Sequence, residues 1–124
     1  SMERVTAALP AGYRAIIGSV GAAGYVPFEV VPAHLSKAVG IRAICDHVGI
    51  ALSHTVALGD SENDVEAVEA AGLGISIGAD CAALVDVADI VAPTVSEDGL
   101  AWALRAAGLT ADERTGGRGL GDAR

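Results

Sequence analysis

The residues best suited to chemistry form one short polar run, in which positions 59–64 read Gly-Asp-Ser-Glu-Asn-Asp. Three of these side chains are carboxylates, which repel one another unless a cation lies among them. Mg²⁺ binds through one or two carboxylates together with water and phosphate oxygens. The run therefore favours a magnesium site.

The flanking residues indicate how this acidic loop is positioned. Thr55 to Leu58 is a short apolar run, Gly59 interrupts it, and Val65 starts a new apolar pattern. This order predicts a buried strand, a tight loop and a helix, with the loop at the carboxyl end of the strand, where open α/β sheets place their sites. A purely structural alternative remains, because Ser61 could cap the helix with acidic residues in its first turn.

A second candidate is Lys37, at the start of a predicted helix. Ile41, Ile44, Cys45 and Val48 recur with helical spacing and predict the buried face of that helix, which Gly49 would end. Ser36 stands at the N-cap position, so Lys37 falls in the first turn. A cation there opposes the helix dipole, which suggests a nearby anion, although a solvated lysine is the simpler alternative for an isolated residue.

The rest of the chain predicts a mixed α/β fold. A short helix before Pro10 and two strands over 14–20 and 26–31, joined by a glycine-rich turn, suggest a β-hairpin. After residue 37, strands over 73–77 and 89–91 alternate with helices, which predicts a parallel sheet. We expect Gly72 to be a helix C-cap, and Asp80 and Ser96 to be helix N-caps. In the last helix we expect the inward-facing residues to be Leu100, Leu104 and Ala107.

Composition narrows the class of protein. The 124 residues suit one compact domain, 52% of them are hydrophobic, and the formal net charge of −8 argues against a nucleic-acid surface. No apolar run is long enough for a bilayer, and the first residues do not resemble a signal peptide. We expect Cys45 and Cys81 to be buried thiols in a reducing, cytoplasmic setting.

The acidic loop resembles the GDxxND motif of the haloacid dehalogenase-like (HAD) phosphatases, and the resemblance extends from about Val26 to Leu104 in the style of the Cof-type sugar-phosphate phosphatases. Lys37 matches the family's upstream motif lysine. Three later segments also match, at 70–78, 88–91 and 96–100. The resemblance implies a partial Rossmann-like parallel sheet with flanking helices. It divides the chain into a cap-like remnant with two strands (1–31), the carboxyl-terminal half of the core (32–109) and a flexible tail (110–124).

The family transfers phosphate to a nucleophilic aspartate and then hydrolyses the aspartyl phosphate. Carried over by motif, Asp60 and Asp64 would serve the Mg²⁺ site, Asn63 would approach the phosphate, and Lys37 would neutralise phosphate charge and hold the nucleophile. The implied substrate is a phosphorylated small molecule of the sugar-phosphate kind.

The sequence departs from the family at the nucleophile, because it contains no DxD motif. Ser19 is a weak candidate for the second motif. We therefore expect half of a phosphatase, inactive alone, whose sheet has an open edge and which forms a homo-oligomer or pairs with a complementing chain. The alternative is a non-catalytic truncated module for binding or oligomerisation. A receiver-like domain is disfavoured because the lysine precedes the acidic loop.

Overall fold

A three-stranded parallel sheet forms the centre of the protein in the computed structural model, which describes residues 2–17 and 27–110. Its strand order is β3 (Val56–Gly59), β4 (Leu73–Ile77) and β5 (Ile90–Ala92). A helix lies between each pair of consecutive strands, so the predicted βα units are confirmed. Among the described residues β3 pairs with β4 alone, and its other edge carries no strand.

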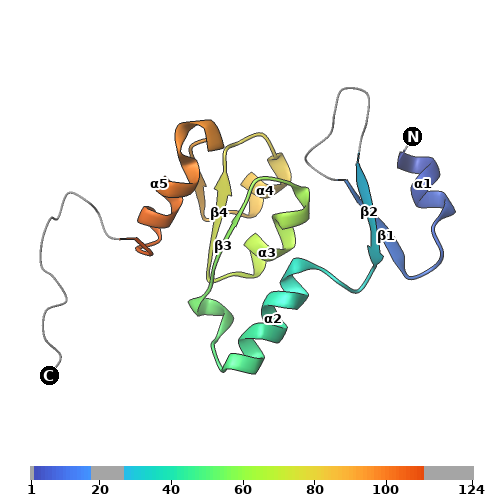
Figure 1. Ribbon diagram of the computed structural model, residues 1–124, viewed down its shortest axis with the longest axis horizontal. Coiled ribbons are helices and arrows are strands. Elements are labelled where there is room, and N and C mark those ends of the chain that lie inside the picture. Colours follow the sequence, from blue (N-terminus) through green and yellow to red (C-terminus); the bar gives the residue numbers. More distant parts are fainter. Residues whose placement is uncertain (1, 18–26, 111–124) are drawn as a thin grey trace, which may run out of the picture.

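Helices cover both faces of this sheet. On one face lie α3 (Val65–Ala70) and α4 (Ala82–Val87), and on the other lies α5 (Gly99–Ala106), as Figure 1 shows. Alternate strand residues point to opposite faces, which gives two small clusters of buried side chains. The cluster beneath α3 and α4 comprises Ala57, Val68 and Leu84, and the cluster beneath α5 comprises Ile75, Ala92 and Ala103.

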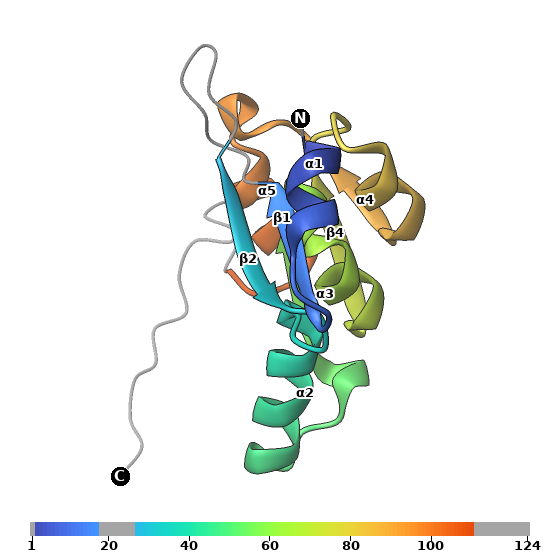
Figure 2. The same cartoon turned by 90° about the vertical axis from the view of Figure 1, so that its right-hand side faces the viewer.

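The amino-terminal part forms a separate antiparallel hairpin. This part comprises α1 (Met2–Ala8), β1 (Tyr13–Ile17) and β2 (Phe28–Pro32), and lies at the opposite end of the molecule from α5 (Figure 1). Figure 2 looks from that end, with α1, β1 and β2 in front of the core. The predicted hairpin is therefore confirmed. The predicted glycine-rich turn, Ser19 and the proposed tail beyond residue 110 lie outside the described residues.

The helix that begins at Lys37 starts and ends where the sequence predicted. α2 spans Lys37–Val48, the Ser36 hydroxyl accepts a hydrogen bond from the Val39 backbone N–H, and Gly49 adopts a left-handed φ of 74° that ends the helix. The predicted inner face is wrong in part. Cys45 is buried, but Ile44 and Val48 expose 64% and 55% of their surface, because no described element packs against that side of the helix.

Three predicted caps also differ. The helix before β4 ends at Ala70, and Gly72 is instead required for close packing, since a Cβ there would lie 2.1 Å from the Ser53 carbonyl oxygen. Cys81 rather than Asp80 precedes α4. Thr94 forms a capping box with Glu97 ahead of α5, where Ser96 was expected to cap.

The predicted inner face of the last helix is wrong at Leu100. Ala103 is fully buried, Leu104 and Ala107 are half-buried, and Leu100 is 54% exposed. Because α5 is short and approaches the sheet closely, alanine and glycine occupy its contact positions. The remaining short elements are single 3₁₀ turns: η1 (Leu52–His54), η2 (Glu62–Asp64) and η3 (Val95–Glu97).

Candidate functional site

The acidic loop lies at the carboxyl end of β3, as predicted, and folds into the turn η2 before α3 begins. Asp64 turns back toward the strand and is buried, with 8% of its surface exposed. This arrangement requires glycine at position 59, because a Cβ there would lie 2.3 Å from the Asp64 Cβ. Gly59 therefore fixes the position of the Asp64 carboxylate.

Both oxygens of the Asp64 carboxylate have partners from this chain. Oδ1 forms an ion pair with the Lys37 ammonium group. Oδ2 accepts hydrogen bonds from the Asp60 backbone N–H at 3.2 Å and from the Ser61 hydroxyl at 3.4 Å. The structure thus brings Lys37 and Asp64 together across 27 residues of sequence.

Polar donors remain available at this cluster. The Lys37 side chain is 54% exposed and carries three N–H donors, of which Asp64 uses one. The Asn63 carbonyl oxygen accepts a hydrogen bond from the Ser61 hydroxyl at 2.7 Å, which leaves the amide N–H groups of Asn63 for another partner. A lysine and an amide that line the same cleft can together bind an anion such as phosphate.

Ser61 does not act as a helix cap through its side chain. It occupies the N-cap position of η2, but its hydroxyl makes no capping hydrogen bond and instead donates to Asn63 and Asp64. The acidic loop is therefore held by its own side chains rather than arranged as a simple helix start.

Asp60 is exposed and lines a second hollow beside the acidic loop. This hollow, of about 500 Å³, lies at the carboxyl ends of the strands, between Asp60 and the segments that follow β4 and β5. Over residues 2–17 and 27–110, no three acidic, histidine or cysteine side chains converge into a metal site. Both oxygens of Asp64 already have partners in this chain, so Asp60 is the motif carboxylate left for a metal. One carboxylate together with water and phosphate oxygens is a donor set that Mg²⁺ accepts, so the donor chemistry fits.

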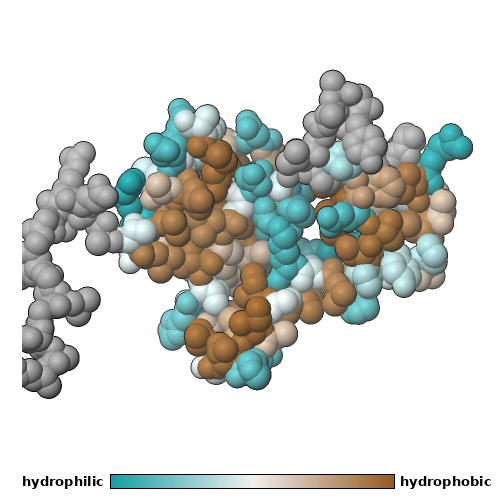
Figure 3. Space-filling view, in the orientation of Figure 1, coloured by the Kyte–Doolittle hydropathy of each residue, from teal (hydrophilic) through white to brown (hydrophobic). Residues whose placement is uncertain are grey.

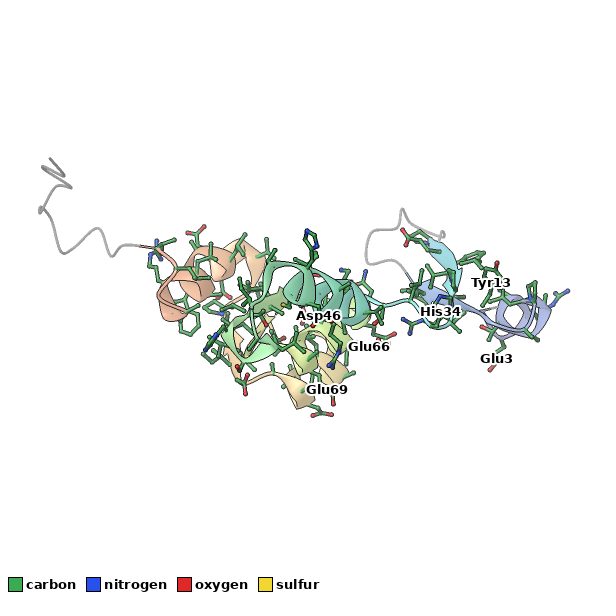
Figure 4. All side chains as sticks on the ribbon, turned by 90° about the horizontal axis from the view of Figure 1, so that it is seen from below. Glu3, Tyr13, His34, Asp46, Glu66 and Glu69 are labelled. Carbon is green, nitrogen blue, oxygen red and sulfur yellow. The ribbon has the colours of Figure 1, made fainter. Side chains whose placement is uncertain are left out.

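A guanidinium group that the sequence did not single out joins the hairpin to the core. Arg14 on β1 forms an ion pair with Glu66 on α3 at 2.9 Å, and also donates to the Leu35 carbonyl oxygen at 3.0 Å. The Ser36 hydroxyl and the Arg14 guanidinium lower the pKa of Glu66 below its ordinary value of 4.5. Figure 4 shows Glu66 on the side of the core that faces the hairpin.

Arg14 and Glu66 lie 52 residues apart, and neither belongs to a motif. No local pattern in the sequence could have predicted their contact.

A cleft of about 590 Å³ opens between the hairpin and the acidic loop. Lys37 and Asn63 lie on its core side, together with Glu62 and Glu66. The hairpin side is mostly apolar, and in Figure 3 a hydrophilic strip separates the apolar surface of the hairpin from that of the core. The candidate anion-binding donors therefore face a space large enough for a small organic molecule.

Comparison with known proteins agrees with this arrangement. The sequence pattern of the haloacid dehalogenase-like hydrolase family matches residues 2–104. A curated relative, the 5-amino-6-(5-phospho-D-ribitylamino)uracil phosphatase YitU of Bacillus subtilis, is 34% identical over 84 residues, which cover 68% of this chain and 31% of the relative. The chain thus spans about a third of the length of the curated relatives that it matches first.

Solved structures show the same likeness. A phosphatase of the haloalkanoate (HAD) superfamily from Bacteroides thetaiotaomicron aligns with 87% of this chain and 38% of its own, with a TM-score of 0.72 and 31% identity. A HAD subclass IIB sugar phosphatase aligns with 77% of this chain and 36% of its own, with a TM-score of 0.65 and 28% identity. The family match, these relatives and the parallel sheet together show that the chain belongs to the Cof-type haloacid dehalogenase-like hydrolases.

Proposed function

We propose that this chain supplies the phosphate- and metal-binding half of a phosphomonoesterase site that acts on phosphorylated small molecules. The observation that carries the proposal is the Lys37–Asp64 pair, held at the end of β3 and open to the cleft. The relative named above is a phosphatase, and one structural neighbour is a sugar phosphatase. Both support a sugar-phosphate class of substrate.

Each residue of the cluster would have a separate task. Lys37 would use its two remaining N–H donors to neutralise the phosphate, and a preorganised cation of this kind stabilises charge that develops during transfer. Asn63 would orient the phosphate through its amide N–H groups. Asp64 would hold Lys37 and close the loop, and Asp60 would offer the exposed carboxylate to Mg²⁺. Bound Mg²⁺ would supply further positive charge at the phosphate oxygens.

The nucleophilic carboxylate would come from a segment paired along the open edge of β3. Its position follows from the sheet, because a parallel strand added there would end beside the acidic loop. We expect that segment to carry the DxD motif that residues 1–124 lack. The proposed division into a cap-like part (1–31) and a core half (32–109) agrees with this arrangement, since the cleft lies between the two.

A chimaera tests the proposal directly. The part of this chain that matches the Bacillus subtilis relative over 84 residues would replace its counterpart in that relative, and Mg²⁺-dependent hydrolysis of an aryl phosphate would be measured. We expect hydrolysis by the chimaera, lost when it carries Asp60→Asn and about 10² to 10³-fold lower with Lys37→Met. Asp86→Asn, an exposed carboxylate on α4, is the matched control. Equal activity in the Asp60→Asn and Asp86→Asn chimaeras would contradict the proposal.

A second candidate function is a non-catalytic module for oligomerisation. Two observations favour it: within residues 2–17 and 27–110 no strand pairs with the outer edge of β3, and α2 exposes Ile44 and Val48. Light scattering behind size exclusion would show a dimer or larger species. A monomer at high concentration would contradict this candidate.

The cellular setting is also a proposal. No helix in the described part of the chain is long and apolar enough to cross a bilayer. Cys45 is buried as predicted, whereas Cys81 was also predicted to be buried and is only half-buried. Both are free thiols, which supports the proposed reducing, cytoplasmic environment.

A further inference from the structure

More carboxylates than cations line the cleft, and both of its cations are already in ion pairs. Two cations line it, Arg14 and Lys37, and each is already paired with a carboxylate of this chain, Glu66 and Asp64 respectively. Two further carboxylates, Glu29 on β2 and Glu62 in the acidic loop, line the cleft and have no ion-pair partner among the described residues. Residues 18–26 contain no charged side chain and so leave this balance unchanged.

The hairpin contributes an apolar wall to the same cleft. Ile16, Ile17 and Val31 line it from the two strands, and Leu35 lines it from the linker. Ile17 and Leu35 each leave 45% of their surface exposed. A bound molecule with an apolar face would remove part of this surface from water, which favours binding.

From this juxtaposition we propose that the cleft selects phosphomonoesters whose organic part is uncharged, with an apolar face toward the hairpin and hydroxyl or amide donors toward Glu29 and Glu62. Organic groups that carry a carboxylate or a second phosphate are disfavoured, because both cations among the described residues that line the cleft are already in ion pairs. The inference rests on the proposed function, which places the phosphate at Lys37 and Asn63.

The size of the selection follows from Coulomb's law. In water, two carboxylates several ångströms from a further negative charge repel it only weakly. Screening at moderate ionic strength reduces this. We expect the anionic member of a matched ligand pair to bind about threefold more weakly at low salt, with the difference shrinking as salt is raised.

The test compares α-D-glucose 1-phosphate with α-D-glucuronic acid 1-phosphate, which differ only in a carboxylate at C6. Both are titrated with Mg²⁺ into ¹⁵N-labelled chain, and amide shifts report the affinity and the location of binding. The uncharged sugar should bind more tightly, with shifts at the acidic loop and along the hairpin strands. Glu29→Gln and Glu62→Gln should each bring the two affinities closer, while Glu69→Gln, an exposed carboxylate of α3 outside the cleft, should leave their ratio unchanged.

The outcomes separate the two proposals. Equal affinities for the two sugars, with shifts in the cleft, would overturn the charge selection and leave the phosphate site intact. Tighter binding of the glucuronic acid ester would likewise overturn it. Failure of both sugars to shift any resonance near Lys37 and Asn63 would overturn the proposed function, and the selection with it.

Discussion

Replacement of Gly59 by alanine tests whether the acidic loop is built as the structure shows. The three heavy atoms nearest to a Cβ at this position all belong to Asp64, at 2.3 Å for Cβ, 2.8 Å for Cγ and 3.0 Å for Oδ2. The backbone of Gly59 is not in the left-handed region, so alanine introduces no conformational strain and the clash alone decides the effect. Overpacking of this kind costs about 1–3 kcal/mol.

The assay is thermal unfolding of purified Gly59→Ala, which should lower Tm by at least about 4 °C. Gly40→Ala in α2 is the matched control, because a Cβ there meets nothing within 4 Å, and alanine in a helix interior stabilises by about 0.5–1 kcal/mol.

Gly59→Ala combined with substitutions of Asp64 shows which atom of Asp64 causes the clash. The closest atom is the Cβ of Asp64 rather than its carboxylate, so Asp64→Gly should remove most of the penalty of Gly59→Ala, whereas Asp64→Ala should retain it. An equal penalty in the Asp64→Gly background, or no penalty in the parent chain, would refute the assigned loop geometry.

Two further predictions concern stability. The Arg14–Glu66 pair is partly exposed, so a double-mutant cycle with Arg14→Gln and Glu66→Gln should give a coupling of about 0.2–1 kcal/mol at neutral pH. The pKa of Glu66 in the folded state is lowered from 4.5, so the contribution of its carboxylate to the free energy of unfolding is complete above that pH and is lost as the pH falls through the folded pKa. A coupling that persists in strong acid would contradict this account. Leu84→Ala should reduce the free energy of unfolding by about 2–5 kcal/mol in chemical denaturation, because Leu84 is fully buried beneath α3 and α4, and a loss below 1 kcal/mol would contradict the described core.

The sequence was informative wherever a local pattern determines a local structure. Strand β3, the acidic loop and the start and end of α2 were predicted because Gly59, Ser36 and Gly49 mark turns through short-range chemistry. Burial was predicted less well. Ile44 and Val48 follow the helical period, but a period shows only that a helix has an apolar face, not that another element covers it.

In the site, too, residues within a motif were predicted, whereas contacts between distant segments were not. Lys37 and Asp64 were placed in one site through a family motif, and the structure brings them into contact. The Arg14–Glu66 contact, the cleft between hairpin and core, and the steric role of Gly72 depend on segments that are distant in sequence. Such contacts are set by tertiary packing, which single-sequence patterns do not encode.

Binding of Mg²⁺ and orthophosphate to the isolated chain tests the central claim most directly. Titration calorimetry would be performed with the parent chain, Asp60→Asn, Lys37→Met and the control Asp86→Asn. The account predicts that phosphate binds more tightly with Mg²⁺ present, that Asp60→Asn abolishes this enhancement, and that Lys37→Met weakens phosphate binding with or without the metal. Identical phosphate affinities in all four proteins, or an enhancement by Mg²⁺ that survives Asp60→Asn, would contradict the assignment of this loop as the phosphate- and metal-binding half of the site.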